Sequence, residues 1–363
     1  MKHSENLFKE FEAVSAEAWL ARITSDLKGK DPESLNHHVG ESIVLSPFHH
    51  ADTMTNPAGP IGRNTQGNEW LIGEAFVVRE DIVSTNKSIL HALENGVQAV
   101  NIMIDRALDK NDFTQLFDQV EPAYIHIHFT IAVSIDPVLI LSEFVNILPD
   151  KKGDKNTFSG SVNIVGTQHS ELQKWAITNL PNFKTWFIGA PFSDPVAQLT
   201  TMIRQGVADL SASDDADIVG QLIFKVNIGT DFFLEIARLR ALRIVWANVL
   251  KSYKIEPTTF PTLMVEFDPS SQTEDANQNM IRATTMAMAA ALGGADLLTV
   301  LPAGAESADE DTMRFHRRIA RNVQHILKME SFIDRVKDVA GGSYYVETLT
   351  TKIGEAVWKN LRT

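Results

Sequence analysis

The sequence contains no cysteine among its 363 residues. Disulfide bonds and thiol chemistry are therefore excluded as sources of stability or reactivity. A chain of this size without disulfides is typical of a reducing compartment, so we expect a cytoplasmic protein. The N-terminal stretch MKHSENLFKEFEAVSAEAW also lacks the apolar segment that a secretory signal needs.

Positive charge is scarce as well. The 33 lysine and arginine residues are outnumbered by 46 aspartate and glutamate residues, which gives a formal net charge of -13. A nucleic-acid-binding surface needs a basic patch that replaces counterions, and an anionic membrane attracts the same kind of patch. We therefore expect neither nucleic acid nor a membrane as a partner.

Long apolar runs are also absent. The most apolar stretch, MAMAAALGGADLLTVLPAGA, is interrupted by Gly293, Gly294 and Asp296. These breaks favour a core helix followed by a strand over a membrane span. Hydrophobic residues nevertheless make up 44% of the chain, which is enough for a large buried core.

Residues 1–65 differ from the remainder in composition. An amphipathic helix is predicted over Val14–Leu27, and the stretches KGKDPESLNHHVGES and TNPAGPIGRNTQGNE that follow are rich in Gly, Pro, Asn and Ser. We interpret 1–65 as a helix and extended arm that packs loosely on its own core and can lie on a partner. Residues 66–363 then form the main domain.

Apolar strand-like runs alternate with helical patterns throughout that domain. Strand–helix alternation predicts a parallel sheet, and eight such units over about 260 residues match a (β/α)8 barrel. A doubly wound open sheet is the alternative, because periodicity does not reveal closure. The eight runs begin near Trp70, Val100, Tyr124, Ser161, Phe183, Ile223, Thr262 and Leu297.

Barrel strands point alternate residues toward the helices and into the lumen. In YIHIHFTI, the isoleucines and Phe129 form the helix-facing row, so Tyr124 and the two histidines point inward. The lumen is thus predicted to be polar, with Lys225 and Glu266 paired and all its polar groups joined in one network. The candidate substrate-binding residues are His126, His128, Asn163, Lys225, Asn227 and Glu266.

The pair His126 and His128 also permits a second interpretation. Two imidazoles at positions i and i+2 of a strand can share a metal ion, as in metal-dependent hydrolases of barrel fold. Asp105 or Glu266 would have to complete the ligand set. A hydrogen-bonded pair inside the lumen and a contact with substrate are the other two possibilities.

Four stretches of the sequence are distinctive: WLARITSDLKGK, TDFFLEIARLRALRIVWANV, NQNMIRATTMAMAAALGGADLL and FHRRIARNVQHILKMESFIDRVKDVAGGSYYVETLT. On these, the chain resembles the adenosylcobalamin-dependent acyl-CoA mutases, above all the methylmalonyl-CoA mutase family. The resemblance implies a (β/α)8 barrel, a partner-wrapping arm, and a lumen through which an acyl-CoA threads.

The chain departs from active members of that family at its chemical groups. Their R-T-H-S-Q-T-S-G segment corresponds here to LMVEFDPSSQTEDANQ, which has no histidine, and their P-Y-T-R-G segment corresponds to GPIGRNTQG, which has no tyrosine. Their T-Q-S-L-H-T segment is replaced by ADLLTV, and the D-x-H-x-x-G signature of the cobalt ligand is missing. We therefore expect no cobalamin-binding domain and no catalytic residues in this chain, whether it is an excised barrel or naturally short.

Two functional classes follow. By resemblance, the chain is a small, non-catalytic subunit that supports a large catalytic subunit in a heterodimer, or self-associates through its arm. The large subunit would bind adenosylcobalamin and convert methylmalonyl-CoA to succinyl-CoA by a radical mechanism, and this chain itself would bind no cofactor, although an acyl-CoA could enter its lumen. The alternative is an autonomous barrel enzyme that uses His126 and His128 as metal ligands.

Overall fold

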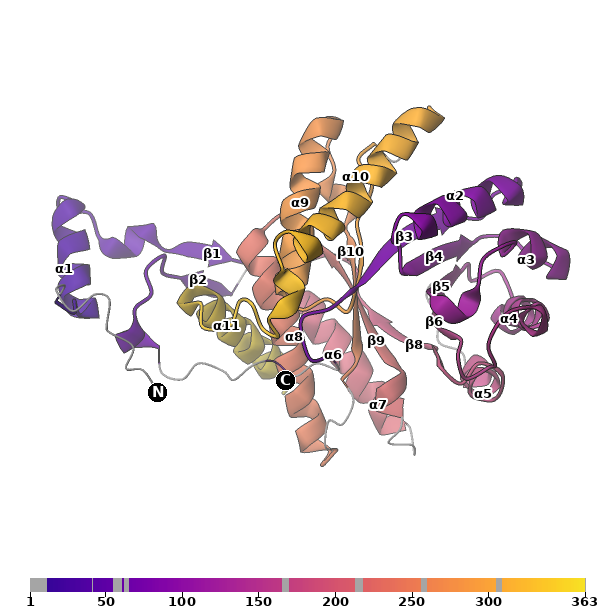
Figure 1. Cartoon of the computed structure of the whole chain (residues 1–363). Coiled ribbons are helices and arrows are strands. Elements are labelled where there is room, and N and C mark those ends of the chain that lie inside the picture. Colours follow the sequence, from indigo (N-terminus) through magenta and orange to yellow (C-terminus); the bar gives the residue numbers. More distant parts are fainter. Residues whose placement is uncertain are drawn as a thin grey trace, which may run out of the picture.

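A computed structural model of the chain has a barrel of parallel strands surrounded by helices, with an arm that extends away from it (Figure 1). No helix in the part of the chain that it describes is long and apolar enough to cross a lipid bilayer. The residues described are 12–40, 42–54, 61, 65–164, 170–212, 218–255, 260–304 and 309–362.

The barrel is closed by one interrupted strand. The strand order is β7-β6-β5-β4-β3-β11-β10-β9-β8, and every neighbouring pair is parallel. Because only Thr185 separates β7 from β8, these two ends of the order are halves of one extended segment, and the ring has eight positions. The prediction of a (β/α)8 barrel is confirmed. The strands are β3 Leu71–Val77, β4 Ala99–Ile104, β5 His126–Ile131, β6 Ser159–Ile164, β7 Phe183–Lys184, β8 Trp186–Gly189, β9 Leu222–Ile228, β10 Thr262–Phe267 and β11 Leu297–Thr299.

Helices follow the strands in turn, and many begin at an aspartate. Asp81, Asp109, Asp136 and Asp231 each accept a hydrogen bond from a backbone N–H of the first turn of their helix. Their negative charge also complements the helix dipole, so part of the chain's acidity serves local structure. The helices are α2 Ile82–Glu94, α3 Lys110–Leu116, α4 Pro137–Val145, α5 Ser170–Asn179, α6 Pro195–Ala212, α7 Ile218–Gln221, α8 Phe232–Ser252, α9 Ala276–Leu292, α10 Glu310–Met329 and α11 Tyr344–Leu361.

Strand alternation is confirmed by burial. Ile127, Phe129 and Ile131 of β5 are fully buried in a core cluster shared with the surrounding helices. Tyr124 is a correction, because it lies before the strand in the 3-10 turn η3 (Pro122–Tyr124), where its side chain is 72% exposed. Pro122 starts this turn, so the strand itself begins only at His126.

The arm consists of helix α1 (Ala16–Asp26) and a hairpin of β1 (His37–Val39) and β2 (Ile43–Leu45). No residue of α1 is buried, as expected for a loosely packed arm. The hairpin departs from that expectation, because Val39, Ile43 and Leu45 are buried in the same core cluster as α11. Residues 55–60 and 62–64, which include most of GPIGRN, lie outside the described residues.

Helix α11 lies outside the helix ring and is fixed there by a buried arginine. The Arg240 guanidinium on α8 contacts Asp338 and lies 2.7 Å from a Glu347 carboxylate oxygen on α11. All three side chains are buried or nearly so. Glu347 also accepts a hydrogen bond from the Gly342 backbone N–H, 3.0 Å away, so this cluster connects α8, the loop before α11 and α11 itself.

Replacing Arg240 with Met leaves two carboxylates without their cation in a buried site. We expect the free energy of unfolding to fall by about 3–5 kcal/mol in urea denaturation. The control is Arg314→Met on α10, whose ion pairs with Glu310 and Asp311 are exposed. That change should cost less than about 1 kcal/mol, and equal losses in the two variants would contradict this account.

Candidate functional site

The candidate site is the barrel lumen. All six polar residues predicted to line it lie on the inward strand face, since their immediate neighbours along each strand belong to the helix-facing core. The register brings Asn227 of β9 beside Glu266 of β10, and it pairs Thr130 of β5 with Asn163 of β6.

One level of the lumen is filled by apolar side chains. They pack against one another from six strands around the ring and are buried or partly buried. Branched and bulky residues at this level are what an ordinary barrel core contains. Apolar side chains from six of the eight ring positions therefore occupy the lumen at this level. The residues of this layer are Leu71, Ala99, Phe187, Ile223, Met264 and Leu297.

A histidine–serine cluster occupies the β5–β6 side. The Ser161 hydroxyl oxygen lies 2.9 Å from His128 Nδ1 and 3.4 Å from His126 Nε2. The other ring nitrogen of His128 lies 3.1 Å from the Thr130 hydroxyl oxygen. Burial lowers the pKa of His126 to about 4, and burial with the nearby Lys225 charge holds the pKa of His128 well below its usual value. Both imidazoles are neutral near pH 7.

An ion pair lies on the β9–β10 side. Lys225 Nζ and a Glu266 carboxylate oxygen are 3.0 Å apart, with 24% and 25% of their side chains exposed. The predicted pairing is confirmed. No hydrogen bond joins this pair to the histidine cluster among the described residues.

The expectation of one network through all six residues was wrong. Asn163 and Asn227 contribute no side-chain hydrogen bond to either group within the described part of the chain. The Phe187 ring lies 5.1 Å from the His128 ring and takes up lumen space. Side chains as short as Asn and Ser do not span a barrel interior past such a ring.

The metal-site alternative is also not supported. His128 is fully buried, and both of its ring nitrogens already contact hydroxyl groups. Glu266 is engaged with Lys225, so it is not directed at the histidines. The residues that the structure describes contain no group of three or more His, Cys, Asp and Glu side chains suited to hold a metal ion.

Sequence reasoning missed Lys184 and Phe187. In the stretch FKTWFIG, Phe183, Trp186 and Ile188 all face the helix-side core, so alternation breaks at Thr185. Lys184 then points inward, and its Nζ donates to the Thr262 hydroxyl, 2.7 Å away on β10. Burial lowers the pKa of Lys184. The signal that could have revealed the break is the pair of aromatics, Phe183 and Trp186, at a spacing of three.

A second hydrogen bond crosses a glycine on the inward face. Asn101 Nδ2 of β4 donates to the Thr299 hydroxyl of β11, 2.6 Å away, although β3 lies between these strands. Gly73 of β3 makes this possible, because a Cβ there would lie only 2.7 Å from the Thr299 hydroxyl oxygen. The end of β11 therefore carries a packed structural contact.

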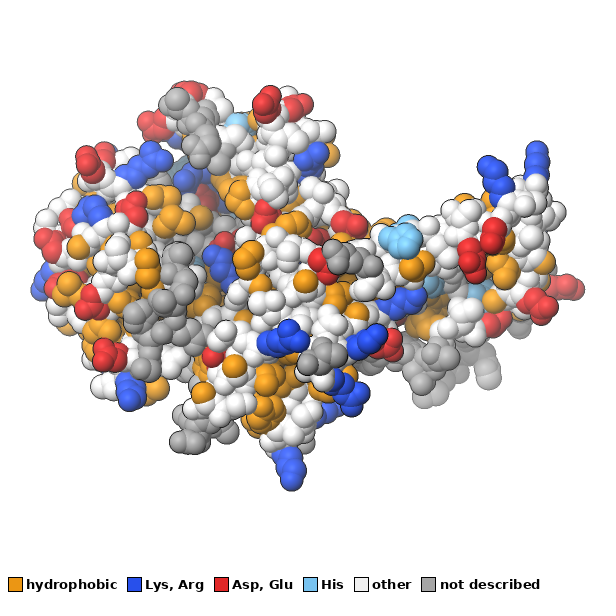
Figure 2. Space-filling view, turned by 180° about the vertical axis from the view of Figure 1, so that it is seen from behind, with side chains coloured by type: hydrophobic (Ala, Val, Ile, Leu, Met, Phe, Trp, Pro, Cys, Tyr) orange, Lys and Arg blue, Asp and Glu red, His pale blue; other side chains and the backbone are white. Residues whose placement is uncertain are grey.

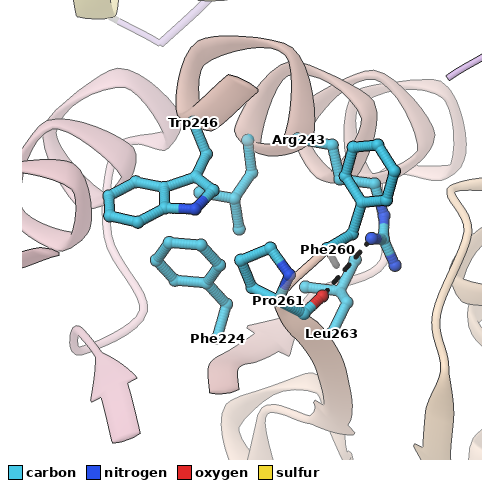
Figure 3. A pocket seen from close by; sticks show the side chains of 7 residues that line it. Phe224, Arg243, Trp246, Phe260, Pro261 and Leu263 are labelled. Atoms are coloured by element: carbon cyan, nitrogen blue, oxygen red, sulfur yellow. Dashed lines mark hydrogen bonds between the residues drawn. The ribbon is translucent and has the colours of Figure 1, made fainter. Parts of the chain in front are cut away.

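The described surface includes a small apolar cleft between α8 and the start of β10. Trp246, Phe224 and Pro261 surround a cavity of about 10 Å³, the space of one water molecule (Figure 3). Arg243 donates to the Pro261 carbonyl at 3.5 Å beside it. A cavity this small does not admit a cofactor or an acyl-CoA.

Comparison with known proteins identifies the family that this chain is similar to. The family model described as methylmalonyl-CoA mutase matches residues 168–363. The methylmalonyl-CoA mutase small subunit of Porphyromonas gingivalis is 30% identical, over 99% of this chain and 64% of its own length. The protein of the same name from Streptomyces virginiae is 28% identical, over 97% of this chain and 64% of its own length.

The chain thus spans a little under two thirds of these relatives. The methylmalonyl-CoA mutase of Escherichia coli is 30% identical over 92% of this chain and 56% of its own length. Among solved structures, dihydropteroate synthase from Thermus thermophilus matches with a TM-score of 0.41 and 13% identity, over 74% of this chain and 98% of its own. These values are too low for any conclusion to rest on that likeness.

The lowered pKa of His126 makes stability depend on pH. The unfolded chain takes up a proton on this imidazole near the ordinary pKa of 6.5, whereas burial lowers the pKa in the folded chain to about 4. Stability is therefore complete above pH 6.5 and is lost as pH falls toward 4, by up to about 3 kcal/mol. We expect His126→Asn to remove this part of the pH dependence in urea denaturation. His91→Asn, at an exposed position on α2, should retain it, and parallel pH profiles of wild type and His126→Asn would refute the assignment.

The quarter exposure of Lys225 and Glu266 limits what the pair contributes. Full burial would predict a loss of about 3–5 kcal/mol on removing one partner, but solvent screening reduces this to roughly 1–2 kcal/mol for Lys225→Met. The double variant Lys225→Met/Glu266→Leu should lose less than the sum of the single changes. Strict additivity in the double-mutant cycle would mean that the two side chains do not interact.

Proposed function

The chain belongs to the methylmalonyl-CoA mutase family, and we propose that it acts as a small, non-catalytic subunit that supports a large catalytic subunit. That partner would bind adenosylcobalamin and convert methylmalonyl-CoA to succinyl-CoA. The names of the relatives from P. gingivalis and S. virginiae support this assignment. The autonomous metal hydrolase is not carried forward, because His128 has no ring nitrogen to offer a metal.

The observation that carries the proposal is the apolar layer across the lumen. A barrel that threads an elongated acyl-CoA needs an open axis, and six packed side chains, including Phe187 and Met264, occupy it here. A lumen filled by side chains is expected in a barrel that binds a partner through its outer surface and does not carry out catalysis in its lumen.

The rim residues do not fit a cobalamin. The segment after β10 has no imidazole, and the Asp268 carboxylate there accepts a hydrogen bond from the Ser270 backbone N–H at 2.9 Å. Thr299 at the end of β11 is engaged with Asn101. No step of the reaction is therefore assigned to this chain.

A limited role in binding acyl-CoA is retained in the proposal. Asn163, Lys225, Asn227 and Glu266 are partly exposed, so they are the proposed contacts for an acyl-CoA segment that enters the lumen above the apolar layer. The fully buried His128, and His126 beside Ser161, would support the shape of that wall.

The arm is the proposed contact with the partner. Helix α1 has no buried residue, and its Trp19 and Leu20 are exposed, with Val14 just before it also exposed. Exposed apolar side chains at the end of a projecting segment favour binding to another chain. We propose the large subunit as that chain, with a second copy of this chain as the alternative.

The purified chain should form no succinyl-CoA from methylmalonyl-CoA when adenosylcobalamin is supplied. Mixed or co-expressed with a large subunit that retains the histidine and cobalamin motifs, it should co-purify and the complex should be active. Activity of the isolated chain, or failure to co-purify with any such large subunit, would overturn the proposed function.

Two arm variants make that experiment specific. Leu20→Asp places a charge on the exposed apolar side of α1 and should reduce recovery of the large subunit at least tenfold. Arg22→Ala is the matched control, because Arg22 lies two residues along the same helix and forms an exposed ion pair with Asp26. Equal recovery with both variants would mean that α1 is not the contact.

A further inference from the structure

The arm hairpin contacts α11 at a tyrosine, Tyr345, which two histidines contact. His37 Nε2 of β1 lies 2.7 Å from the Tyr345 hydroxyl oxygen at the start of α11, and the two rings are nearly parallel. His49, which follows β2, approaches the same ring edge-on with the centroids 5.5 Å apart. Phe233 of α8 contacts Tyr345 as well. Figure 2 shows histidine side chains at the neck where the arm leaves the barrel.

Buried apolar side chains and two further polar contacts also hold the hairpin in place. Val39, Ile43 and Leu45 lie in the same core cluster as α11. Lys352 Nζ of α11 donates to the Val44 carbonyl at 2.6 Å, and the Thr348 hydroxyl lies 3.4 Å from His49 Nδ1. Each hairpin strand has only three residues, and a two-stranded hairpin of that size is not stable in water by itself. Its order therefore depends on docking to α11.

His49 is placed where a proton would be costly. Its Nε2 is buried and has no hydrogen-bond partner among the described residues. A neutral imidazole tolerates this because Nε2 is then a bare acceptor, but a protonated ring would bury an unpaired N–H. The result should be a docked state that excludes the charged form of this side chain.

The surrounding charges act in the same direction. Burial lowers the pKa of His49, and the positive charges of Lys352 on α11 and of His37 on β1 lower it further, while the Ser46 backbone raises it. Burial raises the pKa of Tyr345, and the charge of Asp231 at the start of α8 raises it further, so the phenol stays neutral.

We propose that this junction is a proton-sensitive latch, in which the docking of the arm hairpin on α11 is strongest while His49 is neutral and is weakened when His49 is protonated. The released hairpin binds one more proton than the docked one. Docking is therefore at full strength above about pH 6.5 and weakens as pH falls below it, by up to about tenfold per pH unit, until the docked state itself takes up the proton. The latch concerns this chain alone and does not depend on the proposed mutase partner.

Hydrogen exchange of the full chain at pH 7.5 and pH 5.5 tests the latch, after correction for the intrinsic pH dependence of exchange. The amides of β1 and β2 should lose protection at pH 5.5, by up to about tenfold. His49→Asn should abolish this difference. His38→Asn is the matched control, because His38 is exposed on the same hairpin, and it should retain the difference. Unchanged protection in the wild type, or an unchanged pH response in His49→Asn, would overturn the proposal.

His49→Asn could also release the hairpin at both pH values. In that case the NMR titration of the two imidazoles in the wild-type chain decides. A pKa of His49 clearly below that of His38 supports the latch, and equal pKa values overturn it. Because both measurements use the chain without any partner, they stand or fall separately from the co-purification experiment.

Discussion

Closure of the parallel sheet is the constraint on which the rest of this structure depends. The two edge strands of an open sheet would each leave backbone N–H and C=O groups unpaired. The segment that contains β7 and β8 removes both edges, because it pairs with β6 on one side and with β9 on the other. The break at Thr185 lets one segment pair with both β6 and β9. Closure then divides each strand into a face toward the helices and a face toward the lumen.

That division sets what the lumen can contain. The apolar layer that includes Ile223 and Met264 packs as a core, so the polar groups above it must satisfy one another locally. They do so in separate groups, with Ser161 between two neutral imidazoles and Lys225 beside Glu266.

The contacts that position the arm lie on the outer face of the barrel. Helix α11 is anchored by Arg240 and in turn presents Tyr345 to the arm. The distinctive stretch GGSYYVE thus has a structural explanation, because Glu347 fixes the loop and the helix while Tyr345 receives the hairpin. The hairpin positions α1 away from the barrel, where its apolar side chains are exposed. These exposed side chains are the basis of the proposed contact with another chain.

The sequence alone determined the eight strand positions, the inward row of His126, His128, Asn163, Lys225, Asn227 and Glu266, and the family, because these depend on local periodicity and on residue identity. It did not determine the break at Thr185, the separation of the lumen groups around Phe187, or the docking of the hairpin on Tyr345. Those features depend on distances between segments far apart in the chain. Periodicity assigns a side chain to a face, but which side chains meet across a closed ring is decided by the register of the strands and by the volume of the neighbours, and only the tertiary structure fixes both.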